Sequence, residues 1–194
     1  MIFTTNMMLE KLNDYANPKS KLSRMVKQNE CFQITKGLYE TKEDTPGYLL
    51  AGSIYGPSYI SFDFALSYYG LIPEAVYTVT CATYDKKKKK KYENTFGTFT
   101  YRDVPKEAFP VGIKLIQDGD YYYRIAEPEK ALCDKLYTLN PVSNTRQLET
   151  LLLDYLRIDL DSLKNLDKEK ISSLSKVYHS KNVIKLDVYM RRLK

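Results

Sequence analysis

The first 45 residues show apolar positions at helical spacing, interrupted by polar breaks. Apolar residues share one face of the segment from Thr5 to about Tyr15, which predicts a first helix. The dipeptide Asn17-Pro18 ends that pattern. Because proline suits the first turn of a helix, a second helix is predicted from Pro18 to about Gln28.

The second helix is amphipathic and is followed by signals for a β-hairpin. Its inward stripe consists of three apolar residues, Leu22, Met25 and Val26. Strands are predicted at 31–34 and 38–40, on either side of the tight turn Thr35-Lys36-Gly37. Helix, turn, helix and hairpin in this order predict a winged helix-turn-helix domain over residues 1–45.

A polar linker, TKEDT at 41–45, precedes a larger unit over residues 46–194. Its pattern predicts helices near 48–54, 61–70, 128–137 and 145–156, and further helices between 160 and 193. Strands are predicted at 76–84, 96–101, 113–116 and 121–125, the last two joined by a hairpin turn at Asp118-Gly119. The expected fold class is α+β: a winged helix-turn-helix followed by a mixed α/β domain with antiparallel hairpins and C-terminal helices.

Charge adds a candidate nucleic-acid surface to this picture. The chain of 194 residues has a formal net charge of +6, and the segment from Lys19 to Lys36 has Glu30 as its one acid. A recognition helix needs cations for phosphates, short polar groups for base edges and an apolar back. A solvated amphipathic helix is the alternative. The candidate DNA-binding residues are Lys19, Ser20, Lys21, Ser23, Arg24, Lys27 and Lys36.

A run of six lysines lies between the predicted strands 76–84 and 96–101. Because like charges repel, the run is expected at the tip of a hairpin joining those strands. A solvated tip is the plainer interpretation, and contact with phosphate or an acidic partner is the alternative. The residues concerned are Lys86, Lys87, Lys88, Lys89, Lys90 and Lys91.

No residue pattern indicates catalysis. A metal-dependent nuclease is expected to carry an acid two positions before its lysine, but Pro128 occupies that position relative to Lys130. Glu127 and Glu129 instead suit the start of a helix, where its dipole favours carboxylates. His179 is the one histidine, and a surface or helix-end position is expected for it. No catalytic residue, metal site or cofactor is therefore predicted.

The remaining composition favours a reduced, cytoplasmic protein. Three well-separated cysteines form no CxxC motif, and buried thiols are expected. No segment has the roughly 20 apolar residues of a membrane span, and the first residues do not resemble a signal peptide. A cytoplasmic location without a membrane partner is the expectation.

Two longer strings stand out, PSYISFDFALSYYGLIPEAVYTVT at 57–80 and YRIAEPEKALCDKLY at 123–137, and the predicted wing contains KGLYE at 36–40. Together they resemble the AbiEi family of bacterial antitoxins and transcriptional regulators. Five residues match the helical signature of the family, namely Glu129, Lys130, Ala131, Leu132 and Asp134. That signature is not catalytic in the family.

The resemblance implies a non-enzymatic antitoxin of a toxin–antitoxin system. Its N-terminal domain would bind promoter DNA with inverted repeats and repress transcription, and its C-terminal domain would counter a nucleotidyltransferase-like toxin. Two alternatives stay open. One is a stand-alone transcriptional regulator with a sensing second domain, and the other is a nucleic-acid-processing enzyme. The first predicted helix is short, so a third helix of the DNA-binding domain is missing or displaced.

Overall fold

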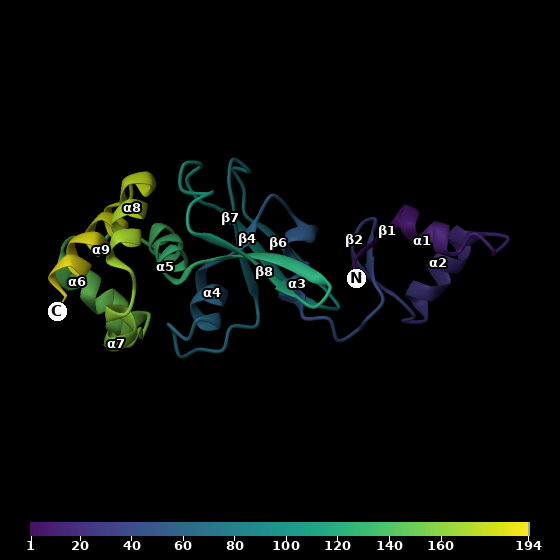
Figure 1. The fold of residues 1–194 in the computed structure, drawn as a ribbon, viewed down its shortest axis with the longest axis horizontal. Helices are drawn as coiled ribbons and strands as arrows, with labels where there is room; N and C mark the ends of the chain where they lie inside the picture. Colours follow the sequence, from purple (N-terminus) through teal and green to yellow (C-terminus); the bar gives the residue numbers. More distant parts are fainter. Residues whose placement is uncertain (194) are drawn as a thin grey trace.

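The computed structural model describes residues 1–193 and shows an elongated molecule (Figure 1). Its N-terminal elements lie at one end, a six-stranded sheet occupies the middle, and the C-terminal helices lie at the other end. Helices and two separate sheets are both present, so the expected α+β class is confirmed.

The N-terminal unit consists of two helices and a small sheet. Its elements are β1 (Phe3–Thr4), α1 (Thr5–Lys11), α2 (Pro18–Lys27), β2 (Phe32–Thr35) and β3 (Leu38–Glu40). Strand β3 lies between β1 and β2, and both pairings are antiparallel. The first helix ends at Lys11 rather than near Tyr15, because Asn13 and Asp14 favour local turns over helix.

The larger sheet has the strand order β6-β7-β5-β4-β9-β8. Its strands are β4 (Tyr59–Ile60), β5 (Val79–Thr83), β6 (Lys90–Asn94), β7 (Gly97–Asp103), β8 (Ile113–Asp118) and β9 (Tyr121–Ala126). The predicted β8–β9 hairpin is confirmed, with Asp118 opposite Tyr121 and Gly119 at φ 56° in the turn. Tyr123 is buried in β9 while Tyr122 faces solvent, as the strand alternation predicts.

The predicted hairpin around the lysine run is wrong. β5 and β7 pair side by side, but they run parallel, and the antiparallel partner of β7 is the additional strand β6. Lys90 and Lys91 belong to β6 instead of a loop tip. An edge strand tolerates lysines because its side chains reach solvent and discourage further strand pairing.

Helices cover the sheet and form the C-terminal end of the molecule. They are α3 (Gly47–Ile54), α4 (Phe62–Tyr68), α5 (Pro128–Tyr137), α6 (Thr145–Thr150), the π-helical turn η1 (Leu151–Tyr155), α7 (Leu160–Lys164), α8 (Lys168–Tyr178) and α9 (Lys181–Arg192). The predicted helix 128–137 is confirmed at both ends. α3 packs on the sheet, where the Tyr101 hydroxyl donates to the Ala51 carbonyl at 2.7 Å. One continuous apolar core extends from α3 to α9.

The small hairpin joins the N-terminal unit to the large sheet. Ile34 of β2 belongs to the main core, and Ile2 and Leu38 pack against it. A separate small cluster lies within the N-terminal unit, with Phe3, Met8, Leu12, Leu22 and Cys31 as its buried members. The Asn94 amide donates to the Ile34 carbonyl at 2.8 Å, and the Tyr121 hydroxyl donates to the Glu40 carboxylate at 2.6 Å. The junction therefore contains specific contacts in addition to the segment at 41–45.

The expected burial of the thiols is confirmed, since Cys31, Cys81 and Cys133 are all buried and free. Burial raises the pKa of the Cys81 and Cys133 thiols well above the ordinary value. Within residues 1–193, no helix combines the length and apolar character needed to cross a membrane.

Candidate nucleic-acid interface

Helix α2 is fixed at its start and along one side. The Asn17 side chain accepts from the Ser20 backbone N–H at 3.0 Å, and Pro18 occupies the first turn. Leu22 is buried among apolar residues of α1, β1 and the segment before β2. The polar side of the helix is left exposed, with Lys19, Ser20, Ser23, Arg24 and Lys27.

Lys21 differs from the other predicted contacts because it has partners within the unit. Its Nζ lies 3.3 Å from the Glu30 carboxylate and 5.6 Å from the centre of the Tyr15 ring. Its side chain is 20% exposed. Its charge is therefore less available to an outside ligand than the charges of Arg24 and Lys27.

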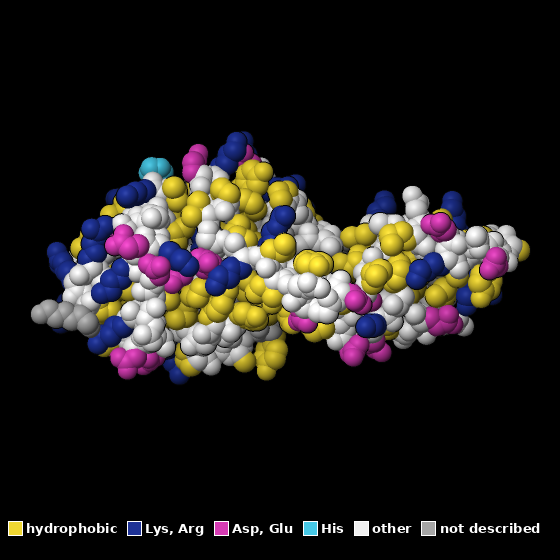
Figure 2. Space-filling view, in the orientation of Figure 1, with side chains coloured by type: hydrophobic (Ala, Val, Ile, Leu, Met, Phe, Trp, Pro, Cys, Tyr) yellow, Lys and Arg dark blue, Asp and Glu magenta, His cyan; other side chains and the backbone are white. Residues whose placement is uncertain are grey.

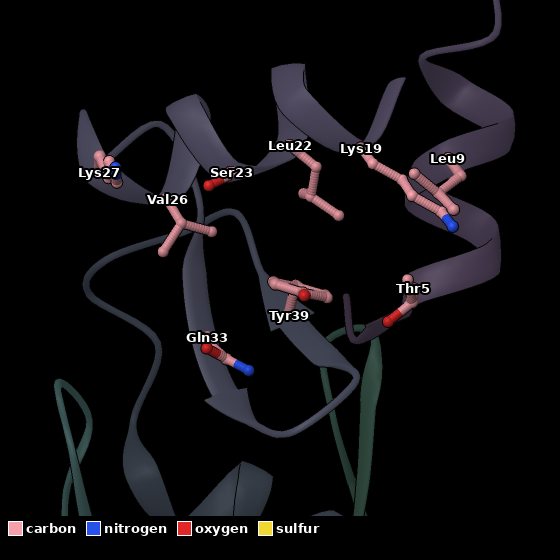
Figure 3. A pocket seen from close by; sticks show the side chains of 9 residues that line it. All are labelled: Thr5, Leu9, Lys19, Leu22, Ser23, Val26, Lys27, Gln33 and Tyr39. Atoms are coloured by element: carbon pink, nitrogen blue, oxygen red, sulfur yellow. The ribbon is translucent and has the colours of Figure 1, made fainter. Parts of the chain in front are cut away.

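An open groove of about 390 Å³ lies between α1, α2 and the small sheet (Figure 3). Lys19, Ser23 and Lys27 line it from α2, at the i, i+4 and i+8 positions of one helical face. Leu22 and Val26 from α2, together with Leu9 and Tyr39, form an apolar part of its wall, and Thr5 and Gln33 complete it.

Lys36 is exposed in the turn between β2 and β3. Gly37 follows it with φ 84°, a left-handed conformation that glycine adopts without strain. The Gly37 carbonyl accepts from the Thr5 backbone N–H at 2.9 Å, which ties this turn to the start of α1. The predicted wing residue thus lies on a fixed turn of the same unit as α2.

The six lysines of the run point to different surroundings. Lys86 Nζ donates to the Gly56 carbonyl at 3.0 Å and lies over the Tyr55 ring, while Lys91 pairs with Glu93. Lys87, Lys88 and Lys89 line a second open pocket beside the end of β7, and Lys90 belongs to β6. On the face drawn in Figure 2, Lys and Arg side chains lie over both ends of the molecule.

Sequence reasoning missed a buried polar cluster in the larger unit. Asp134 accepts from Ser61 Oγ at 2.6 Å, from Tyr59 Oη at 3.0 Å and from the Tyr178 hydroxyl. Lys130 Nζ lies 3.4 Å from the same carboxylate and donates to the Ala108 carbonyl at 2.7 Å. Two features of the sequence could have indicated this cluster. Lys130 and Asp134 have the i, i+4 spacing of residues on one helical face, and Tyr59 and Ser61 alternate as residues on one face of a strand do.

Burial dominates the electrostatics of this cluster. It lowers the pKa of Lys130, and the Asp134 carboxylate opposes that shift. It raises the pKa of Tyr59 and of Tyr178 far above the ordinary value, and the Asp134 charge adds to both shifts. Lys130 and Asp134 are fully buried, and their hydrogen bonds join α5 to β4 and α8.

The two glutamates near Pro128 lie at the start of α5, as predicted. Glu127 pairs with Lys170 at 2.8 Å, and Glu129 accepts from the Asp167 backbone N–H at 2.9 Å. Within residues 1–193, no three His, Cys, Asp or Glu side chains are placed to hold a metal ion. His179 is exposed and ends α8 in a left-handed conformation, which confirms the helix-end expectation.

No protein-family model matches this chain, and no curated protein sequence matches it significantly.

Proposed function

We propose that this chain is a DNA-binding antitoxin and transcriptional repressor similar to the AbiEi family. The observation that carries the proposal is α2, a capped helix with an apolar back and an exposed face of Lys19, Ser20, Ser23, Arg24 and Lys27. Such a helix supplies phosphate contacts and short polar groups together. It is followed directly by the β2–β3 hairpin with Lys36 at its turn.

The N-terminal unit is proposed to be a winged helix-turn-helix in a reduced form. Two observations support this: α1 and α2 are joined by a short turn, and β1 pairs with β3 so that the hairpin lies on a three-stranded sheet. Its partner would be promoter DNA with inverted repeats. The larger unit would counter a nucleotidyltransferase-like toxin, as the resemblance at 57–80 and 123–137 implies.

The DNA-binding part is tested by measuring affinity for the upstream region of the gene as a function of salt. Replacing Lys19, Arg24 and Lys27 by Gln should lower the log–log salt slope by about three, because each removed phosphate contact contributes about one. A control removes three exposed lysines of the C-terminal helices, Lys164, Lys176 and Lys181, in the same way. Equal binding by the α2 variant and the wild type would exclude α2 as the recognition helix.

The antitoxin part is tested separately by co-expression with the neighbouring gene while growth is recorded. Rescue of growth supports neutralisation, and repression without rescue favours a stand-alone regulator. Metal-dependent cleavage of DNA or RNA by the purified chain would favour a nucleic-acid-processing enzyme instead.

A further inference from the structure

A pocket of about 420 Å³ lies where the β5–β6 connection meets the end of β7 and the end of α5. It opens to solvent on the larger unit, away from α2 in the sequence and in the fold. Its lining residues are Lys87, Lys88, Lys89, Arg102, Asp103 and Thr138.

Positive charge in this pocket is not balanced by the protein. Three lysines and one arginine line it, together with a single acid, Asp103. That carboxylate is already engaged, since it accepts from Thr83 Oγ1 at 2.7 Å and from the Lys87 backbone N–H at 2.6 Å. Among residues 1–193, no carboxylate lies within ion-pair distance of the four cations, so the pocket attracts an anion.

The backbone around the pocket is held in a specific conformation. Asp85 and Lys87 have φ near 54° and 55°, in the left-handed region that side chains rarely adopt. Phe62, over whose ring Arg102 lies at 5.6 Å, has φ 55°. A strained backbone conformation persists only where surrounding contacts hold the residue in place, and such conformations are frequent at ligand-binding sites. The Asp103 hydrogen bonds supply that constraint here.

We propose that this pocket binds two or more adjacent phosphate groups. Phosphate groups carry more negative charge in a small volume than carboxylates, which matches four cations around one hollow. Arg102 has the planar fork that binds phosphate oxygens in pairs, and lysines add flexible point charges. The phosphates come either from the polyphosphate of a nucleotide or from a nucleic-acid backbone. The assignment does not depend on α2 being a recognition helix.

Calorimetric titration of the full chain with sodium tripolyphosphate tests the proposal. The main variant is Lys88→Gln/Lys89→Gln, which removes two exposed side chains and leaves Asp103 and its hydrogen bonds in place. This variant should bind tripolyphosphate at least about tenfold more weakly, because it loses two charge-assisted contacts. The control, Lys164→Gln/Lys181→Gln, removes two exposed lysines elsewhere and should bind as the wild type does.

Arg102→Gln is the second variant, and its thermal unfolding is recorded because Arg102 also packs on Phe62.

Parallel titrations with ATP and with a short DNA duplex lacking inverted repeats distinguish the two sources of phosphate. Weaker ATP binding by the main variant indicates a nucleotide, and weaker duplex binding indicates a nucleic-acid backbone. No binding of tripolyphosphate by the wild type, or equal losses in variant and control, would overturn the proposal. A poly-glutamate peptide that binds the wild type as tightly as tripolyphosphate would overturn it too, in favour of an acidic protein partner.

Discussion

Asp134 and Lys130 form a charged pair in the interior of the larger unit, with three hydroxyl groups and a backbone carbonyl completing their hydrogen bonds. Removing one charge from such a pair is costly because the other is left uncompensated in a medium of low polarity. Removing both charges together costs less. Loss of only one member of the pair is therefore the change that destabilises the fold most.

Replacing Asp134 by Ala should lower the free energy of unfolding by about 3–5 kcal/mol. The double variant Lys130→Met/Asp134→Ala should lose less than the sum of the two single losses, because no isolated buried charge remains. Urea unfolding of the three variants and the wild type measures this. Additive losses would show that the two side chains are not coupled.

The pKa of the Glu40 carboxyl predicts how the free energy of unfolding depends on pH. Burial raises the pKa of its carboxyl, but hydrogen bonds from Tyr121 and from the backbone N–H groups of Lys42 and Thr41 outweigh burial, so the pKa is lowered below 4.5. A carboxyl whose pKa is lower in the folded than in the unfolded state stabilises the fold at pH values above its unfolded-state pKa. This contribution is lost as the pH falls through the folded-state pKa.

Unfolding of wild type and Glu40→Gln should therefore differ most near neutral pH. The difference should shrink as pH is lowered from about 4.5, because the protonated Glu40 no longer differs in charge from Gln. Denaturant unfolding across this pH range measures it. A difference that stays constant down to about pH 3 would mean that the Glu40 charge does not stabilise the fold.

At the scale of elements, α2 presents its cations unequally. Lys27 is exposed, whereas Lys21 is held by Glu30 and lies beside Tyr15. If α2 binds DNA, Lys27→Gln should lower the salt slope by about one, and Lys21→Gln should change it by less. Salt-dependent titrations of the two single variants make the comparison. A larger effect of Lys21→Gln would mean that its pairing with Glu30 does not persist on DNA.

Elements with strong local signals were predictable from the sequence. Pro128 opens α5, the Asp118-Gly119 turn closes the β8–β9 hairpin, and Asn17-Pro18 starts α2. These signals lie within a few neighbouring residues, so they need no knowledge of distant contacts. On the candidate surface, the exposure of Lys19, Ser20, Ser23, Arg24 and Lys27 followed from helical spacing in the same way.

Elements that depend on distant partners were not predictable. The parallel pairing of β5 with β7 and the two-residue strands β1 and β4 are defined by their neighbours in the sheet. Lys90 and Lys91 were misplaced because like-charge repulsion excludes a sheet interior but permits an edge strand, whereas Lys86 to Lys89 lie outside the strands as expected. Arg102 and the lysines of the pocket at the end of β7 come from separate segments, and so do the buried partners of Asp134. A single sequence does not show that such segments lie together.

At the scale of the molecule, residues 46–194 contain the large sheet and most of the main core. A chain starting near Thr45 should therefore fold cooperatively. It should be less stable than the full chain because it loses Ile34, whose burial contributes about 1.5–3 kcal/mol, and the Phe32–Phe96 contact. Urea unfolding of the full and the truncated chain measures the difference in their free energies of unfolding.

The same truncated chain should lose operator binding, since α2 is absent, yet rescue cells from the partner toxin if the proposed division of labour holds. Promoter repression and growth rescue are measured together, with soluble protein levels as the control. A truncated chain that is soluble but fails to rescue would mean that neutralisation requires the N-terminal unit.

The hydrogen bonds between Asn94 and Ile34 and between Tyr121 and Glu40 limit pivoting of the N-terminal unit against the sheet. In Figure 1, α2 and the helices α6–α9 lie at opposite ends of the long axis. A duplex held by α2 would leave that far end uncovered, and a second macromolecule docked there would not collide with it. Such a chain is suited to binding DNA and a partner protein at the same time, so that the degree of repression would depend on how much partner protein is present.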